Sequence, residues 1–279
     1  MIKVITDSSC DLSAEALAEY NIEMIPLTVT FANGESFLDR VEISPQEFAG
    51  RLSTSPHLPR TSNPDVQTFF EVFEKDLFLR DGLLYISISS KLSTAHETAM
   101  IARKMLNTDK IKIIDSLTAS SGVGMLAIRA AELVDQGQGL MEIVHEVAAC
   151  RDRMETVLTV NTLDNLIKGH RLTKTEGFVD NLLDVRPILW GVEGEIDIVG
   201  RIRGRRRSLA RMAYLLNQFC NGLHDRNLSI SHLDCMEDVE YIKWYIEKHY
   251  GPQKQILVSE MGATVGTYIG RGGIIMSCY

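Results

Sequence analysis

The chain has 279 residues, of which 45% are hydrophobic and 24% charged, a composition typical of a globular protein long enough for two domains. Its 29 basic and 37 acidic residues give a net charge of −8, which argues against nucleic acid as the main partner. No apolar run approaches the roughly 18–20 residues of a membrane span. No secretory signal is expected, because Lys3 lies inside the first expected strand. These features predict a cytoplasmic protein with no stable insertion into a membrane.

The cysteines and histidines do not form a recognisable metal or disulfide pattern. The five cysteines are far apart and include no C-x-x-C pair, so free thiols in a reducing compartment are expected. The seven histidines show no H-E-x-x-H spacing, and no metal site is expected.

The first half of the chain alternates between strands and helices. Apolar, β-branched runs predict strands at 2–6, 25–31, 83–88 and 112–115. Helix starts are indicated at Asp11 or Ser13, at Ser44 before Pro45, and at Asn63 before Pro64. Thr94 with Glu97 three residues later has the spacing of a capping box. This alternation predicts a parallel sheet covered by helices on both faces.

The pattern changes after about residue 155, where strands begin to outnumber helices. Strands are expected at 156–160, 188–192, 195–199, 228–233, 255–259 and 274–278, and the main helices at 207–222 and 239–250. We therefore expect an N-terminal α/β domain over residues 1–155. An α+β domain with a largely antiparallel sheet is expected over residues 156–279.

Hydroxyl side chains stand at two expected helix N-termini in the first domain. Thr61 and Ser62 precede one helix, and Ser93 and Thr94 precede another. Neutral donors beside a helix N-terminus suit a carboxylate or phosphate, and ligands of open α/β sheets bind at the edge where such loops lie. The alternative is ordinary helix capping, which on the Ser93 stretch alone is the more frequent explanation.

Two further segments are candidates for ligand contact. Residues 262–273 hold five glycines together with Thr267 and Tyr268, which predicts either a loop that approaches a ligand or a mobile turn. Residues 201–207 hold five arginines, including Arg203, which predicts a solvated basic face or a contact with phosphate or an acidic partner.

A hydrolase acting through Ser93 and His96 is the enzymatic alternative, because residues three apart can meet across one helical turn. The sequence has no G-x-S-x-G elbow and places no acid behind His96, which argues against this alternative.

Eight segments, in order along the chain, together resemble the DegV family, the bacterial fatty-acid-binding proteins that include FakB-type subunits of fatty acid kinase. The segments are ITDSSCDLS (5–13), TSNP (61–64), ISSKLSTAHETA (88–99), IIDSLTASSGVGMLA (113–127), IKGHRL (167–172), RPIL (186–189), RIRGRRRSL (201–209) and VGTYIGRGG (265–273).

The resemblance implies two domains with one fatty acid buried between them. It implies that Thr61 and Ser93 bind the carboxylate and that the glycine-rich segment with Thr267 and Tyr268 closes over the head group. Tyr268 stands where the family has histidine. The resemblance also matches Arg171 and Arg203 to arginines implicated in kinase engagement or phosphoryl transfer, and we expect both to be dispensable for lipid binding.

The function expected from these features is that of a lipid carrier linked to phospholipid metabolism, with no enzymatic activity and no cofactor of its own. It would bind a long-chain, palmitate-like fatty acid and present the carboxylate to a separate, ATP-binding fatty acid kinase, which forms an acyl phosphate. The alternatives are the Ser93/His96 hydrolase and a stand-alone lipid sensor.

Overall fold

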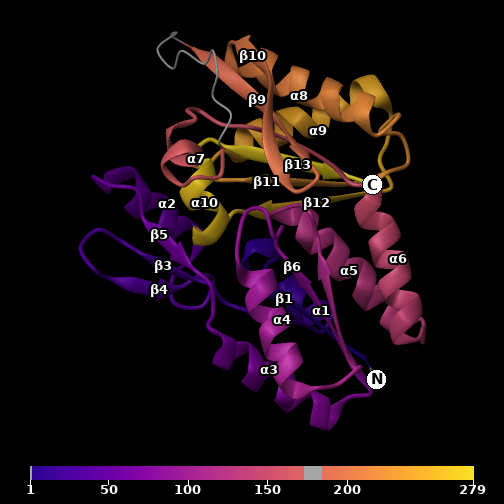
Figure 1. The fold of residues 1–279 in the computed structure, drawn as a ribbon. Helices are drawn as coiled ribbons and strands as arrows, with labels where there is room; N and C mark the ends of the chain where they lie inside the picture. Colours follow the sequence, from indigo (N-terminus) through magenta and orange to yellow (C-terminus); the bar gives the residue numbers. More distant parts are fainter. Residues whose placement is uncertain (1, 173–183) are drawn as a thin grey trace.

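The structure, a computed structural model, describes residues 2–172 and 184–279. Within these residues the chain forms two lobes, each built around its own β-sheet, and a small third sheet at their side (Figure 1). The expected α/β fold, with a parallel sheet followed by a largely antiparallel one, is confirmed.

The sheet of the first lobe is parallel throughout, as the alternating pattern predicts. Its strands lie in the order β2 (Ile22–Ile25), β1 (Ile2–Asp7), β6 (Gly82–Ser87) and β7 (Ile111–Asp115). Alternate side chains point to opposite faces of the sheet, so each face needs its own cover of helices.

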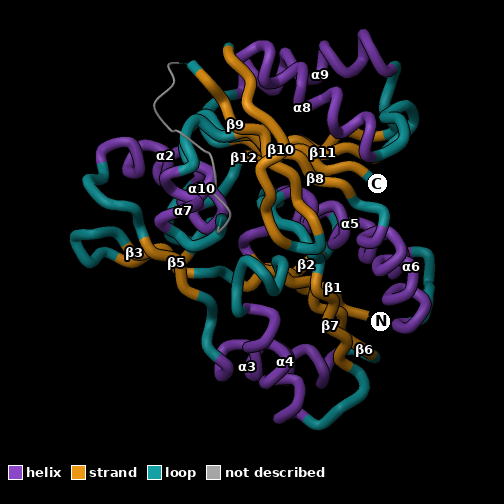
Figure 2. The backbone as a smooth tube through the Cα atoms, turned by 45° about the horizontal axis from the view of Figure 1, so that its top comes forward, coloured by secondary structure: helices purple, strands orange, loops and turns teal. Residues whose placement is uncertain are grey.

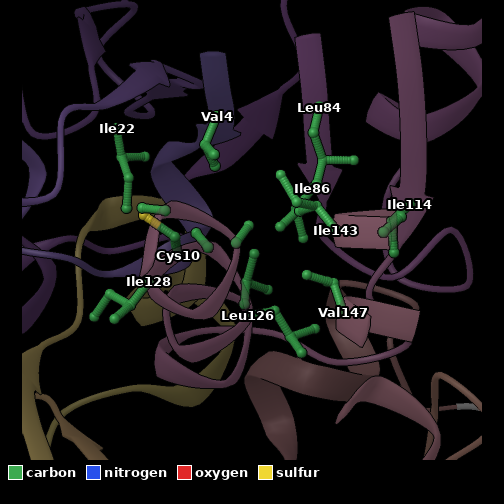
Figure 3. Packing of buried hydrophobic residues seen from close by; sticks show 14 of the residues in the cluster. Val4, Cys10, Ile22, Leu84, Ile86, Ile114, Leu126, Ile128, Ile143 and Val147 are labelled. Atoms are coloured by element: carbon green, nitrogen blue, oxygen red, sulfur yellow. The ribbon is translucent and has the colours of Figure 1, made fainter. Parts of the chain in front are cut away.

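Different helices cover the two faces of this sheet. Val4, Leu84 and Ile86 pack against α5 (Ser121–Asp135) and α6 (Leu140–Asp152), and their side chains converge in Figure 3. Helix α1 (Ala14–Glu19) lies beside this core, after a short 3₁₀ turn at Ser8–Cys10. The opposite face carries α3 (Val66–Leu79) and α4 (Ala95–Leu106), which bury Tyr85 between Phe69 and Phe73.

The sheet of the second lobe has one parallel pair and is otherwise antiparallel. Its strands lie in the order β10 (Glu195–Arg203), β9 (Val185–Val192), β8 (Glu155–Thr159), β13 (Ile274–Cys278), β11 (Asn227–His232) and β12 (Gln255–Glu260). Helices α8 (Arg205–Phe219) and α9 (Met236–Tyr250) cover its outer face, at the opposite end of the molecule from α3 and α4 (Figure 2). The inner face meets the first lobe, and α7 (Asp164–Lys168) and α10 (Ala263–Ile269) lie on that side.

The single strand expected over residues 25–31 is wrong, because two strands in different sheets occupy this segment. Pro26 follows the end of β2, and its missing amide hydrogen and fixed φ favour the break. The chain then enters the small antiparallel sheet of β4 (Ser36–Leu38), β3 (Thr28–Thr30) and β5 (Arg60–Ser62), with α2 (Pro45–Thr54) alongside. Phe48 of α2 shares a core with Leu158 and Ile275, so this part of the N-terminal half packs on the second lobe.

The expected helix starts are partly right. Ser44 caps α2 through its side chain, as predicted, and of the two candidates for α1 it is Ser13, not Asp11, that caps the helix. Helix α3 is capped by Asp65 rather than Asn63, whose side-chain oxygen instead accepts a hydrogen bond from Ser93. Thr94 precedes α4, but its hydroxyl makes no capping bond, so the expected capping box does not form. The glycine-rich segment expected to be a loop contains helix α10.

Candidate ligand-binding site

One cavity of about 480 Å³ lies between the two lobes, within the roughly 300–1,000 Å³ that pockets for small molecules usually have. Loops after β6 and β7, together with Leu27 and residues 61–63 at the end of β5, form one wall. The other wall is formed by β8, β13, the β9–β10 hairpin, the end of α7 and helix α10. Much of the lining is apolar and comes from Leu27, Ile88, Leu92, Leu117, Leu158, Leu166, Ile196, Val265, Ile269 and Ile275.

The polar lining includes two groups of hydrogen-bonded side chains. The Thr61 hydroxyl lies 2.6 Å from the phenol oxygen of Tyr268. Ser93 donates to Asn63 Oδ1 at 2.7 Å, and Asn63 Nδ2 donates to Thr94 Oγ1 at 2.6 Å. These five residues, which we call the hydroxyl cluster, bring together segments of both lobes, and all of them line the cavity.

Tyr268 is held on both sides by residues at the end of α7. The Arg171 guanidinium lies over the phenol ring, with Cζ 4.3 Å from the ring centroid. Arg171 Nε also donates to the Leu92 carbonyl at 3.2 Å, which ties the arginine to the first lobe. A Cβ on Gly169 would overlap the Tyr268 ring, so only glycine leaves room for this packing.

Lys91 and His170 also line the cavity, yet both are exposed. The cavity therefore reaches solvent where these two side chains lie. The positive charge of Lys91 at such a place attracts anions.

The turn between β9 and β10 closes part of the cavity from the second lobe. Ser89 of the first lobe donates to the Gly194 carbonyl at 2.8 Å. Gly194 has φ +86°, and a Cβ there would overlap the Ser89 hydroxyl. Because Gly191, Gly194 and Ile196 line the cavity, this contact fixes a wall of the site.

Two buried carboxyl groups lie at the carboxyl-terminal edge of the first sheet. Burial raises the pKa of Asp7 despite hydrogen bonds from Ser9, Tyr85 and the Ile88 amide. Burial also raises the pKa of Asp11 to about 6, against the opposing effects of Arg40, Ser120 and the Gly262 amide. Neither carboxyl group is among the cavity-lining residues.

The structure brings together most, but not all, of the site residues predicted from the sequence. Thr61, Ser62, Ser93, Thr94, Tyr268 and Arg171 all line the cavity. Thr267 does not: its hydroxyl donates to the Ala263 carbonyl inside α10 at 2.7 Å. Arg203, at the exposed end of β10, also lies outside the lining.

The pairing required by the hydrolase alternative is replaced by other contacts. His96 Nδ1 lies 3.0 Å from the Ser87 hydroxyl, while Ser93 donates to Asn63. Asn63, which had been expected only to cap a helix, instead joins Ser93 to Thr94. Its position in T-S-N-P, directly after two hydroxyl residues, was the available sequence signal.

Three further findings concern disulfides, metal ligands and membrane-spanning helices. All five cysteines are free thiols. Among the residues that the structure describes, no group of three or more His, Cys, Asp or Glu side chains is placed to hold a metal ion. No helix in the described ranges is both long and apolar enough to cross a membrane.

The fold and the cavity define a two-lobed α/β protein with a small-molecule site between its lobes. The DegV family, described as uncharacterised proteins, matches residues 1–277, and the chain belongs to this family. A DegV domain-containing protein of Clostridium acetobutylicum is 30% identical over 271 residues, covering 96% of this chain and 95% of the relative.

Solved structures of DegV proteins have the same fold. A DegV family protein from Thermus thermophilus, described as binding fatty acid, superposes with a TM-score of 0.92 at 27% identity, covering 100% of this chain and 99% of that one. The fatty acid kinase B3 protein of Streptococcus pneumoniae, loaded with linoleic acid, superposes with a TM-score of 0.87 at 21% identity, covering 99% and 98%. At that identity the second likeness concerns the fold alone.

Proposed function

We propose that this protein binds one long-chain fatty acid in the cavity between its lobes, with the carboxylate at the hydroxyl cluster. The observation that carries the proposal is that one cavity joins Thr61, Ser93 and Tyr268 to a largely apolar wall. A fatty acid has the same division, a small polar head and a long apolar chain. The fatty-acid binding described for the Thermus thermophilus relative supports the assignment.

Neutral hydroxyls suit a carboxylate that leaves water. Serine, threonine and tyrosine can donate to it without a buried cation of their own. Arg171 supplies positive charge from behind the Tyr268 ring, which makes the phenol hydroxyl a better donor than it would be alone. Burial of a 16-carbon chain contributes roughly 11–13 kcal/mol at ~0.8 kcal/mol per methylene, before the costs of ordering and association.

We further propose that the bound carboxylate is presented to a separate kinase that converts it into an acyl phosphate. Exposed Lys91 and His170 at the cavity support this step, because they show that part of the cavity lining can be reached from solvent. Arg203, exposed at the end of β10, is the residue proposed for contact with that partner. The chain itself would carry no catalytic residue, which agrees with the engagement of His96 by Ser87.

Analysis of lipids that co-purify with the protein tests the binding proposal. Native mass spectrometry should show a bound species with the mass of a C14–C18 fatty acid, and solvent extraction should identify its chain length and unsaturation. A Thr61→Ala/Ser93→Ala double variant should retain markedly less of it. Wild-type affinity for fatty acid in that folded variant would contradict the placement of the carboxylate.

A further inference from the structure

Helix α10 begins on a carboxylate supplied by a distant part of the chain. Asp39, directly after β4, is completely buried. Its Oδ1 accepts from the Ala263 amide at 2.7 Å, and its Oδ2 accepts from the Thr264 amide at 3.0 Å and the Thr264 hydroxyl at 2.6 Å. The first amides of a helix have no partner within the helix, so Asp39 takes the part of a capping residue from 224 positions away.

Neighbouring groups fix the position of Asp39 and the start of α10. The Asp39 amide donates to the Leu27 carbonyl at 2.8 Å, and Leu27 lines the cavity. Asp11 accepts from the Gly262 amide at 2.7 Å, and a Cβ on Gly262 would stand 2.6 Å from Asp39 Oδ1. The Arg40 guanidinium donates to Asp11 and to the Glu260 carbonyl, which binds the preceding strand to the same place.

The regular geometry of a helix transmits this anchor to the ligand site. Thr264 and Tyr268 are four residues apart, so they lie on one face of α10, separated by about 6 Å along its axis. Both line the cavity. Two hydrogen bonds to Thr264 therefore fix the direction in which Tyr268 projects, and the contact with Arg171 holds the ring from the other side.

We propose that Asp39 is a positioning residue for head-group recognition: it sets helix α10 so that the Tyr268 hydroxyl meets Thr61. This inference rests on the proposed function. Asp39 itself is not among the cavity-lining residues, so it acts through α10.

The test compares hexadecanoic acid with hexadecan-1-ol, which differ only in the head group. The preference is the ratio of the affinities for the acid and for the alcohol, and wild type should prefer the acid. Tyr268→Phe should reduce the preference by about 2- to 10-fold, the effect of one hydrogen bond. Asp39→Ala should reduce it by a similar factor, and Asp39→Ala/Tyr268→Phe should reduce it no further, because both changes remove the same contact. Asp39→Asn should restore much of the preference, since its amide oxygen still accepts one α10 amide.

Ser13→Ala is the matched control, because it removes a cap from α1, which supplies no cavity residue. It should leave the preference unchanged. Wild-type preference in folded Asp39→Ala, or additive losses in the double variant, would overturn the proposal. If Asp39→Ala does not fold, Gly262→Ala replaces it, because the added Cβ displaces the Asp39 carboxylate.

A measurement without ligand separates this inference from the proposed function. In protein labelled with ¹³C at the tyrosine ζ carbon, the Tyr268 resonance is identified by its loss in Tyr268→Phe. The chemical shift of this resonance should change in Asp39→Ala and remain unchanged in Ser13→Ala. If wild type binds neither hexadecanoic acid nor hexadecan-1-ol, the proposed function fails, and the resonance still decides whether Asp39 positions Tyr268. An unmoved resonance would refute the positioning role.

Discussion

At the scale of single residues, the contact between Thr61 and Tyr268 is the central polar feature of the site. Thr61→Val keeps the shape of the side chain and removes its hydroxyl. We expect fatty-acid affinity to fall by about 0.5–2 kcal/mol, because one donor to the carboxylate is lost. Isothermal titration with hexadecanoic acid measures this change. Thr30→Val on the neighbouring strand removes a hydroxyl that bonds to Ser36 instead, and it should leave affinity unaltered.

Asp11 predicts a pH dependence of stability. Its folded pKa, about 6, lies above the ordinary value of 3.8, so the folded state holds the proton more tightly. The contribution of protonated Asp11 to the unfolding free energy is fully present below about pH 3.8 and is lost as the pH rises through 6. It amounts to roughly 3 kcal/mol at most. Asp7, whose pKa is also raised, acts in the same direction.

Urea unfolding at pH 4 and pH 6.5 tests this assignment. Asp11→Asn cannot titrate, and asparagine tolerates the positive φ of 53° at this position. The decline in unfolding free energy between the two pH values should be smaller in Asp11→Asn than in wild type. Exposed Asp65, whose pKa is lowered by hydrogen bonds from Thr68, supplies the control Asp65→Asn. An equal decline in all three proteins would show that Asp11 does not titrate in this range.

At the scale of elements, the β9–β10 hairpin connects the lobes through its turn. Gly194→Ala should be destabilising, because it strains a positive φ and drives a Cβ into the Ser89 hydroxyl. Since the turn is a cavity wall, the release of bound fatty acid should also accelerate, which stopped-flow displacement measures. Gly34→Ala imposes a comparable backbone strain at φ +88° in open space. It should lower stability without changing the release rate; equal release rates in both variants would refute a role for the hairpin contact.

The elements also show how far the sequence determines the fold and the site. Alternating strands and helices, and the hydroxyl residues that precede α3 and α4, are local patterns. They predict the parallel sheet and three of the five residues of the hydroxyl cluster, while Tyr268 comes from the glycine-rich segment. Helix α10 was not predictable locally, because five glycines between 262 and 273 disfavour a helix. The Asp39 cap stabilises it, and Gly266 fits where a Cβ would stand 2.9 Å from Phe48. Both contacts come from residues more than 200 positions earlier.

At the scale of the whole molecule, the two arginines associated with a kinase partner occupy different environments. Arg203 is exposed and outside the cavity, so Arg203→Ala should leave fatty-acid affinity unchanged and slow acyl-phosphate formation by a cognate kinase. Arg171 packs on Tyr268, which argues against the expectation that it is dispensable for lipid binding. Arg171→Ala should lower both affinity and the kinase rate. Loss of lipid in Arg203→Ala would contradict this division.

The cavity wall comes from both lobes, so the bound lipid should stabilise their association. A ligand that binds only the folded state raises the unfolding free energy by about 2.7 kcal/mol when its free concentration is one hundred times its Kd. For a chain of this size that corresponds to roughly 5–10 °C in unfolding temperature. Protein stripped of lipid should therefore melt earlier and recover when hexadecanoic acid is added.

Hydrogen exchange should locate the effect of the lipid. Protection should fall on removal of lipid in α10 and the β9–β10 turn, which line the cavity, and stay constant at the C-terminal end of α3, which does not. Mass spectrometry of the stripped sample verifies that the ligand has gone. An unchanged unfolding temperature, or a uniform loss of protection across both lobes, would contradict a ligand that binds between them.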